Sequence, residues 1–362
     1  MNRQNIPCAL SILLENLPAI PLANPLRRSG LAAVGRAVLL AAPLAALVTA
    51  LVTPGGLLAQ SGDAAFPVKP IRILVPLAPG GGNDAIARMV GARLQDRLGQ
   101  SIVVDNRPGA GGVVGTEIAA RAAPDGYTMI VVNNSHVVMS ALYSKLSFDP
   151  IRDFTPISLA AASPLMVVVH PSLPINTVTE LLAWTRANPG KMNYGTSGVG
   201  SPPHLAGELM AQMGKVEMTP IVFKGIGPAL TAVLGNEIPM TFPNTLVGIP
   251  QMKAGRVRAI AITSLKRSEA LPDMPTVAES GMPGYEAIIW FGFLAPQGVP
   301  RPLVDRLNRE IVGVLKMPEV RQQIVGIGAE PIASSVAEFA AVMKADGERL
   351  GRLIKERGIK AE

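Results

Sequence analysis

A strand, a run of glycines and a helix follow one another directly between residues 71 and 98. Residues 71–77, IRILVPL, are apolar and β-branched enough to predict a buried strand, and the apolar spacing of residues 84–98 predicts an amphipathic helix. Pro79 and three glycines, 80–82, lie between them. The first N–H groups of a helix have no intrahelical acceptor, and glycine allows close approach to the backbone. This junction therefore predicts either a site for an anionic group or a tight turn that needs positive φ.

Two further junctions of the same kind occur at residues 193–210, NYGTSGVGSPPHLAGELM, and at residues 223–235, FKGIGPALTAVLG. Ser201 is in position to be an N-cap, with Pro202 as the first helical residue. Carboxylates suit such loops, because they accept several N–H bonds and are stabilised by the positive end of a helix. Phosphate is the competing ligand, but the sequence contains no GxxxxGK[ST] and places Asp84 where a phosphate loop needs lysine.

Strand-like and helix-like segments alternate from Phe66 onward, which predicts an α/β fold with mainly parallel sheets. The apolar segments near 163–168 and 288–292 are interpreted as two crossings between lobes that share a hinge. We expect lobe 1 to contain residues 66–165 and 291–362, and lobe 2 to contain residues 166–290. The last helices are predicted at 302–315, 319–325 and 336–357, the last with a capping box from Ser335 and Glu338 and with Gly358 as its end.

The first 65 residues are interpreted as a signal peptide and leader. Arg27, Arg28 and Arg36 precede the apolar run 37–52, and helix breakers and small residues follow it. A membrane anchor is the alternative, but the run has 16 residues and contains Pro43. Arg27 and Arg28 leave a twin-arginine route open beside the general secretory one. We expect a periplasmic protein.

Composition excludes several classes of function. Cys8 is the single cysteine, so a disulfide, a cysteine zinc cluster and a cysteine nucleophile are excluded downstream of it. Residues 66–362 carry 29 basic and 24 acidic side chains, which are interspersed along the chain. Binding to nucleic acid is therefore not expected.

The sequence predicts no catalytic residue, no metal site and no cofactor. Residues 107–115, RPGAGGVVG, suggest a dinucleotide loop, but their glycine spacing departs from GxGxxG and favours a turn or a loop that shapes a cleft. The three histidines, His136, His170 and His204, lack the spacing of metal ligands. His204 lies in the first turn of a predicted helix, where a packing or capping role competes with ligand contact.

The quoted junctions, with residues 103–128, VVDNRPGAGGVVGTEIAARAAPDGYT, resemble in order and spacing the substrate-binding proteins of tripartite tricarboxylate transporters, the Bug family. The resemblance extends from about Phe66 to the end of the chain. It implies a two-lobed periplasmic binding protein fold with a hinge. It also implies a monomeric receptor that captures a small molecule, often a carboxylate, and delivers it to membrane subunits of a transporter.

The resemblance also implies which residues contact the ligand. In the first lobe these are Ala78, Pro79, Gly81, Gly82 and Asp84, and in the second lobe Thr196, Ser197, Gly200, Ser201 and His204. Asp84 is expected either to meet an amine of the ligand or to order the loop. Residues 238–248 lack the acid often found near Pro243 and Asn244, which leaves the ligand's identity open. Two alternatives remain: a secreted α/β enzyme acting on a small carboxylate, and a ligand sensor for a signalling partner.

Overall fold

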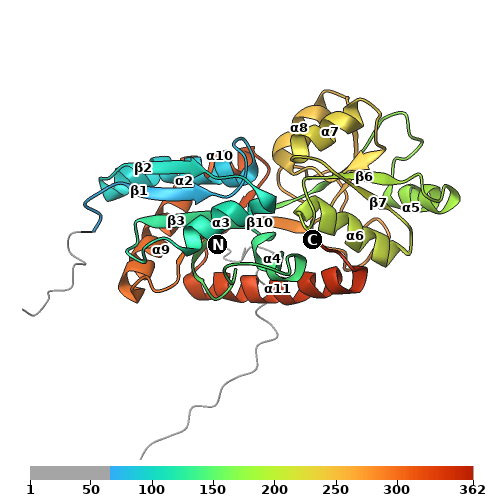
Figure 1. Ribbon diagram of the computed structural model, residues 1–362. Helices are drawn as coiled ribbons and strands as arrows, with labels where there is room; N and C mark the ends of the chain where they lie inside the picture. Colours follow the sequence, from blue (N-terminus) through green and yellow to red (C-terminus); the bar gives the residue numbers. More distant parts are fainter. Residues whose placement is uncertain (1–65, 362) are drawn as a thin grey trace, which may run out of the picture. The chain divides into compact units, whose positions relative to one another are not determined.

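The computed structural model describes residues 66–361, which form two β-sheets covered by helices (Figure 1). The first sheet has the strand order β11-β4-β10-β3-β1-β2, and the second has the order β7-β6-β8-β5-β9. The strands of the first sheet are β1 (Ile71–Val75), β2 (Ile102–Asn106), β3 (Thr128–Asn133), β4 (Phe154–Pro164), β10 (Ile288–Pro296) and β11 (Glu330–Pro331). Those of the second are β5 (Met166–Val169), β6 (Asn193–Thr196), β7 (Thr219–Val222), β8 (Met240–Thr241) and β9 (Arg258–Ile262).

The helices that follow the first three strands are α2 (Gly82–Leu98), α3 (Val113–Ala120) and the short α4 (Met139–Leu142). The 3₁₀ turns η2 (Ala110–Gly112) and η3 (His136–Val138) lead into α3 and α4. The second sheet carries α5 (Val178–Ala187), α6 (Pro202–Gly214), α7 (Ile226–Leu234) and α8 (Thr245–Lys253). The chain ends with α9 (Arg301–Leu315), α10 (Pro318–Gly326) and α11 (Val336–Arg357).

Helix ends follow the local chemistry of the sequence closely. Ser335 accepts a hydrogen bond from the N–H of Glu338, and the Glu338 side chain accepts one from the N–H of Ser335, which completes the predicted capping box of α11. Gly358 ends this helix in the left-handed conformation, as Gly99 ends α2. The predicted bounds of α11 therefore agree with the structure.

The α/β fold is confirmed, but the expectation of mainly parallel sheets is wrong in detail, because both sheets are mixed. β1 is parallel to β2 and β3, whereas β10 is antiparallel to both β3 and β4. In the second sheet β6 is parallel to β7 and β8, whereas β5 is antiparallel to β8 and β9. The physical reason is that β4, β5, β9 and β10 flank the passages between the sheets, so they run in opposite directions as outgoing and returning strands.

The chain passes from β4 to β5 at Leu165 and returns between the end of β9 and the start of β10. Thr263, which is fully buried, joins the two passages. Its N–H donates to the carbonyl of Leu165 over 3.0 Å, and its hydroxyl accepts from the N–H of Leu165 over 2.7 Å. The same hydroxyl donates to the carbonyl of Ala287 over 2.7 Å, and the N–H of Ala287 donates to the Thr263 carbonyl over 2.9 Å. One side chain thus links both passages.

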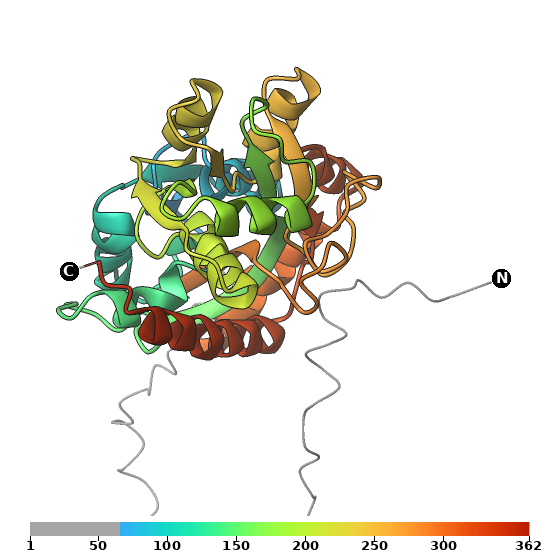
Figure 2. The ribbon, with the colours of Figure 1, turned by 90° about the vertical axis from the view of Figure 1, so that its right-hand side faces the viewer.

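Helix α11 covers one side of the first sheet and extends to α6 of the second. Phe339 of α11 packs edge-on against Trp290 of β10, with ring centroids 5.4 Å apart. At the other end of the helix, Arg357 forms an ion pair with Glu208 of α6. Figures 1 and 2 both show α11 passing beneath α6, and Figure 2 places the second sheet and its helices toward the viewer. The C-terminal helix therefore contacts elements of both sheets.

We predict that Thr263→Val destabilises the protein by about 2 kcal/mol or more, because it keeps the side-chain shape but leaves the Leu165 N–H and the Ala287 carbonyl without a buried partner. Urea unfolding of the ligand-free protein measures the change. Thr155→Val is the matched control, since Thr155 makes a solvent-exposed hydrogen bond to Gln297. Its effect should stay within about 0.5 kcal/mol. Equal effects at the two positions would contradict the role assigned to Thr263.

Candidate functional site

The first junction joins β1 to α2 through residues 76–81 and presents backbone N–H groups. Gly80 has φ +82°, and Gly81, the N-cap of α2, is extended with φ −85°. The N–H groups of Gly82, Asn83 and Asp84 open the helix without intrahelical acceptors. Among residues 66–361 no side chain caps this helix. The predicted need for positive φ therefore falls on Gly80, and a row of donors follows it.

Asp84 orders this junction. Its carboxylate accepts the N–H of Gly80 over 3.0 Å and the Arg88 Nε over 3.0 Å, and its side chain is nearly buried. Burial alone would raise the pKa of Asp84, but the hydrogen bonds from Arg88 and Gly80 outweigh it and lower the pKa below the ordinary value. Of the two roles expected for Asp84, the one visible in the structure is to hold the loop.

Asn83 and Gly82 pack against strands of the first sheet behind the junction. The amide of Asn83 donates to the carbonyl of Val131, and its oxygen accepts from Asn133 over 3.1 Å. A Cβ at Gly82 would lie 2.5 Å from the ring of Phe291, so only glycine fits there. At Gly81 the nearest atom to such a Cβ is 3.8 Å away, and Ala78 and Pro79 are exposed. Residues 78–81 thus form the open edge of the junction.

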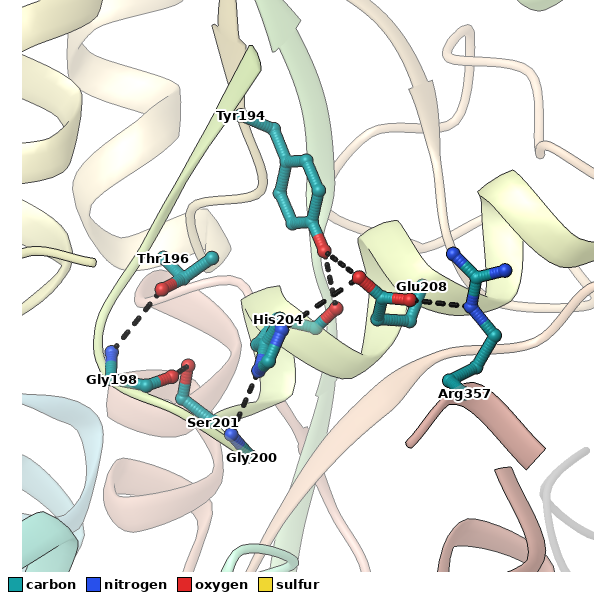
Figure 3. Close-up of polar contacts among 8 residues, drawn as sticks. All are labelled: Tyr194, Thr196, Gly198, Gly200, Ser201, His204, Glu208 and Arg357. Atoms are coloured by element: carbon teal, nitrogen blue, oxygen red, sulfur yellow. Dashed lines mark hydrogen bonds and ion pairs between the residues drawn. The ribbon is translucent and has the colours of Figure 1, made fainter. Parts of the chain in front are cut away.

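The second junction joins β6 to α6 and holds its own shape with hydrogen bonds (Figure 3). The Ser201 hydroxyl donates to the carbonyl of Gly198 over 2.7 Å instead of capping α6. Ser201 occupies the predicted N-cap position, but the expected side-chain cap is wrong. Its hydroxyl is turned to Gly198, and Pro203 lacks one of the two N–H groups that an N-cap side chain can accept. The start of α6 therefore offers fewer donors than the start of α2.

His204 fixes the middle of this loop. Its Nδ1 accepts the N–H of Gly200 over 2.9 Å, and the side chain is 5% exposed. Burial lowers the pKa of His204, and the nearby Glu208 carboxylate opposes the effect only in part. The imidazole is therefore neutral at pH 7, with its proton on Nε2. The geometry favours the packing role of His204 over ligand contact.

What remains available in the second loop is a short stretch of backbone. Thr196 is fully buried, and Gly198 N lies 3.5 Å from its hydroxyl. Within the described part of the chain, no backbone hydrogen bond uses the N–H of Ser197 or Val199, and both residues are partly exposed. These two N–H groups are the donors that the loop presents.

The third junction lies against the second. Gly225, with φ +121°, is the N-cap of α7, and Pro228 stands at the third helical position without an N–H. The N–H of Phe223 donates to the carbonyl of Thr196 over 3.0 Å. The beginnings of α6 and α7 are thus held beside each other at the ends of the parallel strands β6 and β7.

Helix α4 packs on the second junction and on the turn that adjoins the first. Leu142 packs so closely on Gly200, which has φ +69°, that a Cβ there would overlap the leucine. At the other end of α4, Met139 packs on Gly112, which in turn adjoins Pro76. The two loops predicted from separate lobes are therefore connected through one short helix.

Residues 109–112 form a left-handed turn. Their φ angles are +150°, +64° and +102° at the three glycines and +44° at Ala110. The carbonyl of Ala110 accepts a hydrogen bond from the Tyr143 hydroxyl over 3.0 Å. Backbone conformation thus accounts for these glycines, and the turn interpretation is favoured over dinucleotide binding.

A small pocket beside the first junction contains His136. The pocket is lined by Asn83, Gly112, Thr116, Asn133 and His136 among others. His136 is 2% exposed, its Nε2 lies 2.6 Å from the carbonyl of Pro150, and its Nδ1 has no partner within the described residues. Burial lowers the pKa of His136 to about 4, against the opposing effect of the Pro150 carbonyl.

Several residues that shape the site were not identified from the sequence: Arg88, Leu142, Glu208 and Arg357. For two of them a signal exists, because Asp84 and Arg88, like His204 and Glu208, stand four residues apart on one helix face. Leu142 and Arg357 are distant in sequence from the loops they support, so spacing gives no indication of them.

Over residues 66–361, no cluster of three or more His, Cys, Asp or Glu side chains is arranged to hold a metal ion. In the same range, no helix has the length and apolarity needed to cross a membrane.

Comparison with known proteins places this architecture in a family. Residues 86–359 match the tripartite tricarboxylate transporter family receptor. The chain belongs to this family. It is 36% identical over 293 residues to a protein from the tcbD-tcbE intergenic region of a Pseudomonas species, covering 81% of this chain and 87% of the relative. It is 32% identical over 319 residues to protein BugT of Bordetella pertussis, covering 88% and 98%.

Solved structures support the same assignment. The periplasmic binding protein BugD is 33% identical, with a TM-score of 0.75 and coverage of 82% of this chain and 100% of BugD. An R. palustris protein with adipate is 34% identical, with a TM-score of 0.77 and coverage of 81% and 99%. MatC from Rhodopseudomonas palustris with bound malate is 31% identical, with a TM-score of 0.73 and coverage of 80% and 100%. The two-lobed periplasmic binding protein fold is thereby confirmed.

We predict that His136 makes folding stability depend on pH. Its folded pKa of about 4 lies below the unfolded value near 6.5, so the stabilisation is complete above pH 6.5 and is lost as the pH falls toward 4. The loss attributable to this group is about 3 kcal/mol. Urea unfolding of wild type and His136→Gln between pH 7 and 4.5 measures it, and the variant should show the shallower dependence. His170→Gln, at a partly exposed position, is the control for replacement of a histidine by glutamine. Parallel curves for His136→Gln and wild type would contradict the assignment.

Proposed function

We propose that this protein is a periplasmic receptor that captures a small carboxylate between the first and second junctions. The observation that carries the proposal is the open first turn of α2, where consecutive N–H groups follow an unobstructed Gly81. Residues 78–84 and 194–204 contain no lysine or arginine. A bound carboxylate would therefore be held by backbone N–H groups, hydroxyls and helix ends.

The ten residues expected at the site fall into two groups by their contacts. Ala78, Pro79, Gly81, Gly82 and Ser197 are exposed or partly exposed and are proposed to contact the ligand. Asp84, Thr196, Gly200, Ser201 and His204 are buried and are proposed to fix the loops that do so. The second group thus acts through the backbone that it holds.

The lobes are proposed to be residues 66–165 with 291–362, and residues 166–290. The distribution of the strands supports this division, because β1–β4, β10 and β11 form one sheet and β5–β9 form the other. The boundary at 290 differs by three residues, since β10 begins at Ile288 and pairs with β4 from there. The paired passages at Leu165 and Thr263 are the proposed hinge. Closure about it would bring the two junctions together on the ligand.

The carboxylate assignment is also supported by relatives, since one similar structure contains adipate and another contains bound malate. We propose that the receptor, as a monomer, releases its ligand chemically unchanged to the membrane subunits of a tripartite tricarboxylate-type transporter. Native mass spectrometry of protein purified without denaturation would identify a retained ligand. Chemical conversion of the bound carboxylate into a product would instead support an enzyme.

We predict that Gly81→Val weakens binding of the retained carboxylate at least about tenfold while leaving the fold intact. The backbone of Gly81 suits a β-branched residue and the nearest atom lies 3.8 Å from a Cβ, so the new side chain would occupy the space proposed for the ligand. Calorimetry with the ligand identified by mass spectrometry, and with adipate and malate, measures the change. Gly326→Val, at an exposed position with nothing within 4 Å, is the matched control. If folded Gly81→Val bound the carboxylate with wild-type affinity, the glycine run would be only a turn without a role in binding.

We further propose that residues 1–65 export the chain and are removed; this segment lies outside the described residues. The basic, apolar and small-residue order of residues 27–65 predicts cleavage between about Ala59 and Phe66. Amino-terminal sequencing of the periplasmic protein tests this prediction, and replacement of Arg27 and Arg28 by lysine separates twin-arginine from general secretory export. A periplasmic chain that retains residues 30–50 would rule out the cleavage.

A further inference from the structure

Glu208 places a buried carboxylate between the second junction and the C-terminal helix (Figure 3). One oxygen accepts the Tyr194 hydroxyl over 2.9 Å, and the other accepts the Nε of Arg357 over 2.6 Å. The Glu208 side chain is 7% exposed, whereas Arg357 is 35% exposed. A carboxylate so far from water needs its cationic partner, so α6 depends electrostatically on α11.

His204 connects this ion pair to the loop. Its Nε2 lies 3.7 Å from Glu208 Oε1, and its Nδ1 accepts the N–H of Gly200. Nδ1 accepts this bond only while it carries no proton, which requires the proton of the neutral ring to be on Nε2. The negative charge of Glu208 faces Nε2 and favours that tautomer. The charge on α6 thus determines whether Gly200 has an acceptor.

We propose that Glu208 and Arg357 are positioning residues of the second junction: their ion pair fixes the tautomer of His204, and His204 in turn fixes Gly200 and the loop around it. Only the consequence for ligand binding rests on the proposed function. The C-terminal helix is then part of the binding apparatus, although its residues lie outside the glycine loops.

A second contact at the end of the chain supports this role. The N–H of Ala361 donates to the carbonyl of Leu142 over 3.0 Å, and Leu142 is the side chain that packs on Gly200. The last residues of the chain therefore support the same glycine from two directions, through Leu142 and through His204. Simple packing of α6 against α11 would not require two contacts that both lead to Gly200.

Charge changes at the two positions should move the titration of His204 in opposite directions. The ionisable groups that face the ring are Tyr194 of β6 and Glu208 of α6, with Arg357 of α11 behind Glu208. Arg357→Met leaves the carboxylate without its partner, so the protonated imidazole is favoured and the titration midpoint rises by about one pH unit or more. Glu208→Gln removes the anion, so the midpoint falls. Loss of packing alone would not produce opposite signs.

The experiment is an NMR titration of the ring nitrogens of His204, with amide hydrogen exchange of Gly200, on the ligand-free protein. Both variants should accelerate Gly200 exchange at pH 7, for different reasons. Arg357→Met raises the protonated fraction of the ring, and Glu208→Gln removes the charge that favours the tautomer with Nδ1 as acceptor. Arg357→Lys keeps the charge and should restore the wild-type midpoint. Gln212→Ala removes the other hydrogen bond between α6 and α11, the exposed one from Gln212 to Glu356, and should leave the midpoint unchanged.

If Arg357→Met is too unstable to titrate, Glu208→Gln with Arg357→Met removes both charges. That double variant should show the midpoint of Glu208→Gln. Midpoints that move in the same direction, or Gly200 exchange equal to that of Gln212→Ala, would overturn the proposal. Because no ligand is present, these results are independent of whether the junctions bind a carboxylate.

Discussion

The hydrogen bonds of Thr263 are the constraint on which the two-sheet arrangement depends. The chain leaves the first sheet at Leu165 and comes back at Ala287, and both passages are bonded to this one buried threonine. Two strands that share a fixed point can twist together more easily than they can slide apart. The proposed hinge at this point would permit rotation of the sheets while it preserves their register. The mixed direction of the strands follows from the same cause, because an outgoing and a returning passage placed side by side must be antiparallel.

The sequence predicts the helices of this chain well because their ends are encoded locally. Ser335, Glu338 and Gly358 specify α11 without help from the rest of the molecule. No helix was predicted over α8; Pro250 lies inside it, yet Asn244 caps it and the turns accommodate the proline. The antiparallel pairing of β4 with β10 joins residues more than a hundred positions apart. No local sequence pattern contains such a pairing, so the prediction of mainly parallel strands was wrong.

The candidate site shows the same division. The glycine junctions and the proline at the start of α6 are visible as short motifs, and the structure contains them. What each residue does within a junction depends on its partners. Positive φ belongs to Gly80 and not to Gly81, and Ser201 bonds backwards to Gly198 instead of capping α6. Pro203 lacks the N–H at the second helical position, so the sequence itself contains a signal against a side-chain cap at Ser201.

In both junctions a buried carboxylate lies near a loop that is proposed to bind an anion. In each, a glycine with positive φ donates its N–H to a side chain four residues later: Gly80 to Asp84, and Gly200 to His204. A carboxylate beneath an anion site would repel the anion, but the Asp84 charge is balanced by Arg88 on the outer side of the helix.

In the second junction the carboxylate is one step further away. Neutral His204 takes the glycine N–H, and Glu208 lies behind it, balanced by Arg357. Each acid therefore orders its loop while it is paired with an arginine. In the proposed binding mode, loops fixed in this way lose little conformational entropy on ligand binding, which leaves more of the interaction energy of their few free N–H groups for affinity.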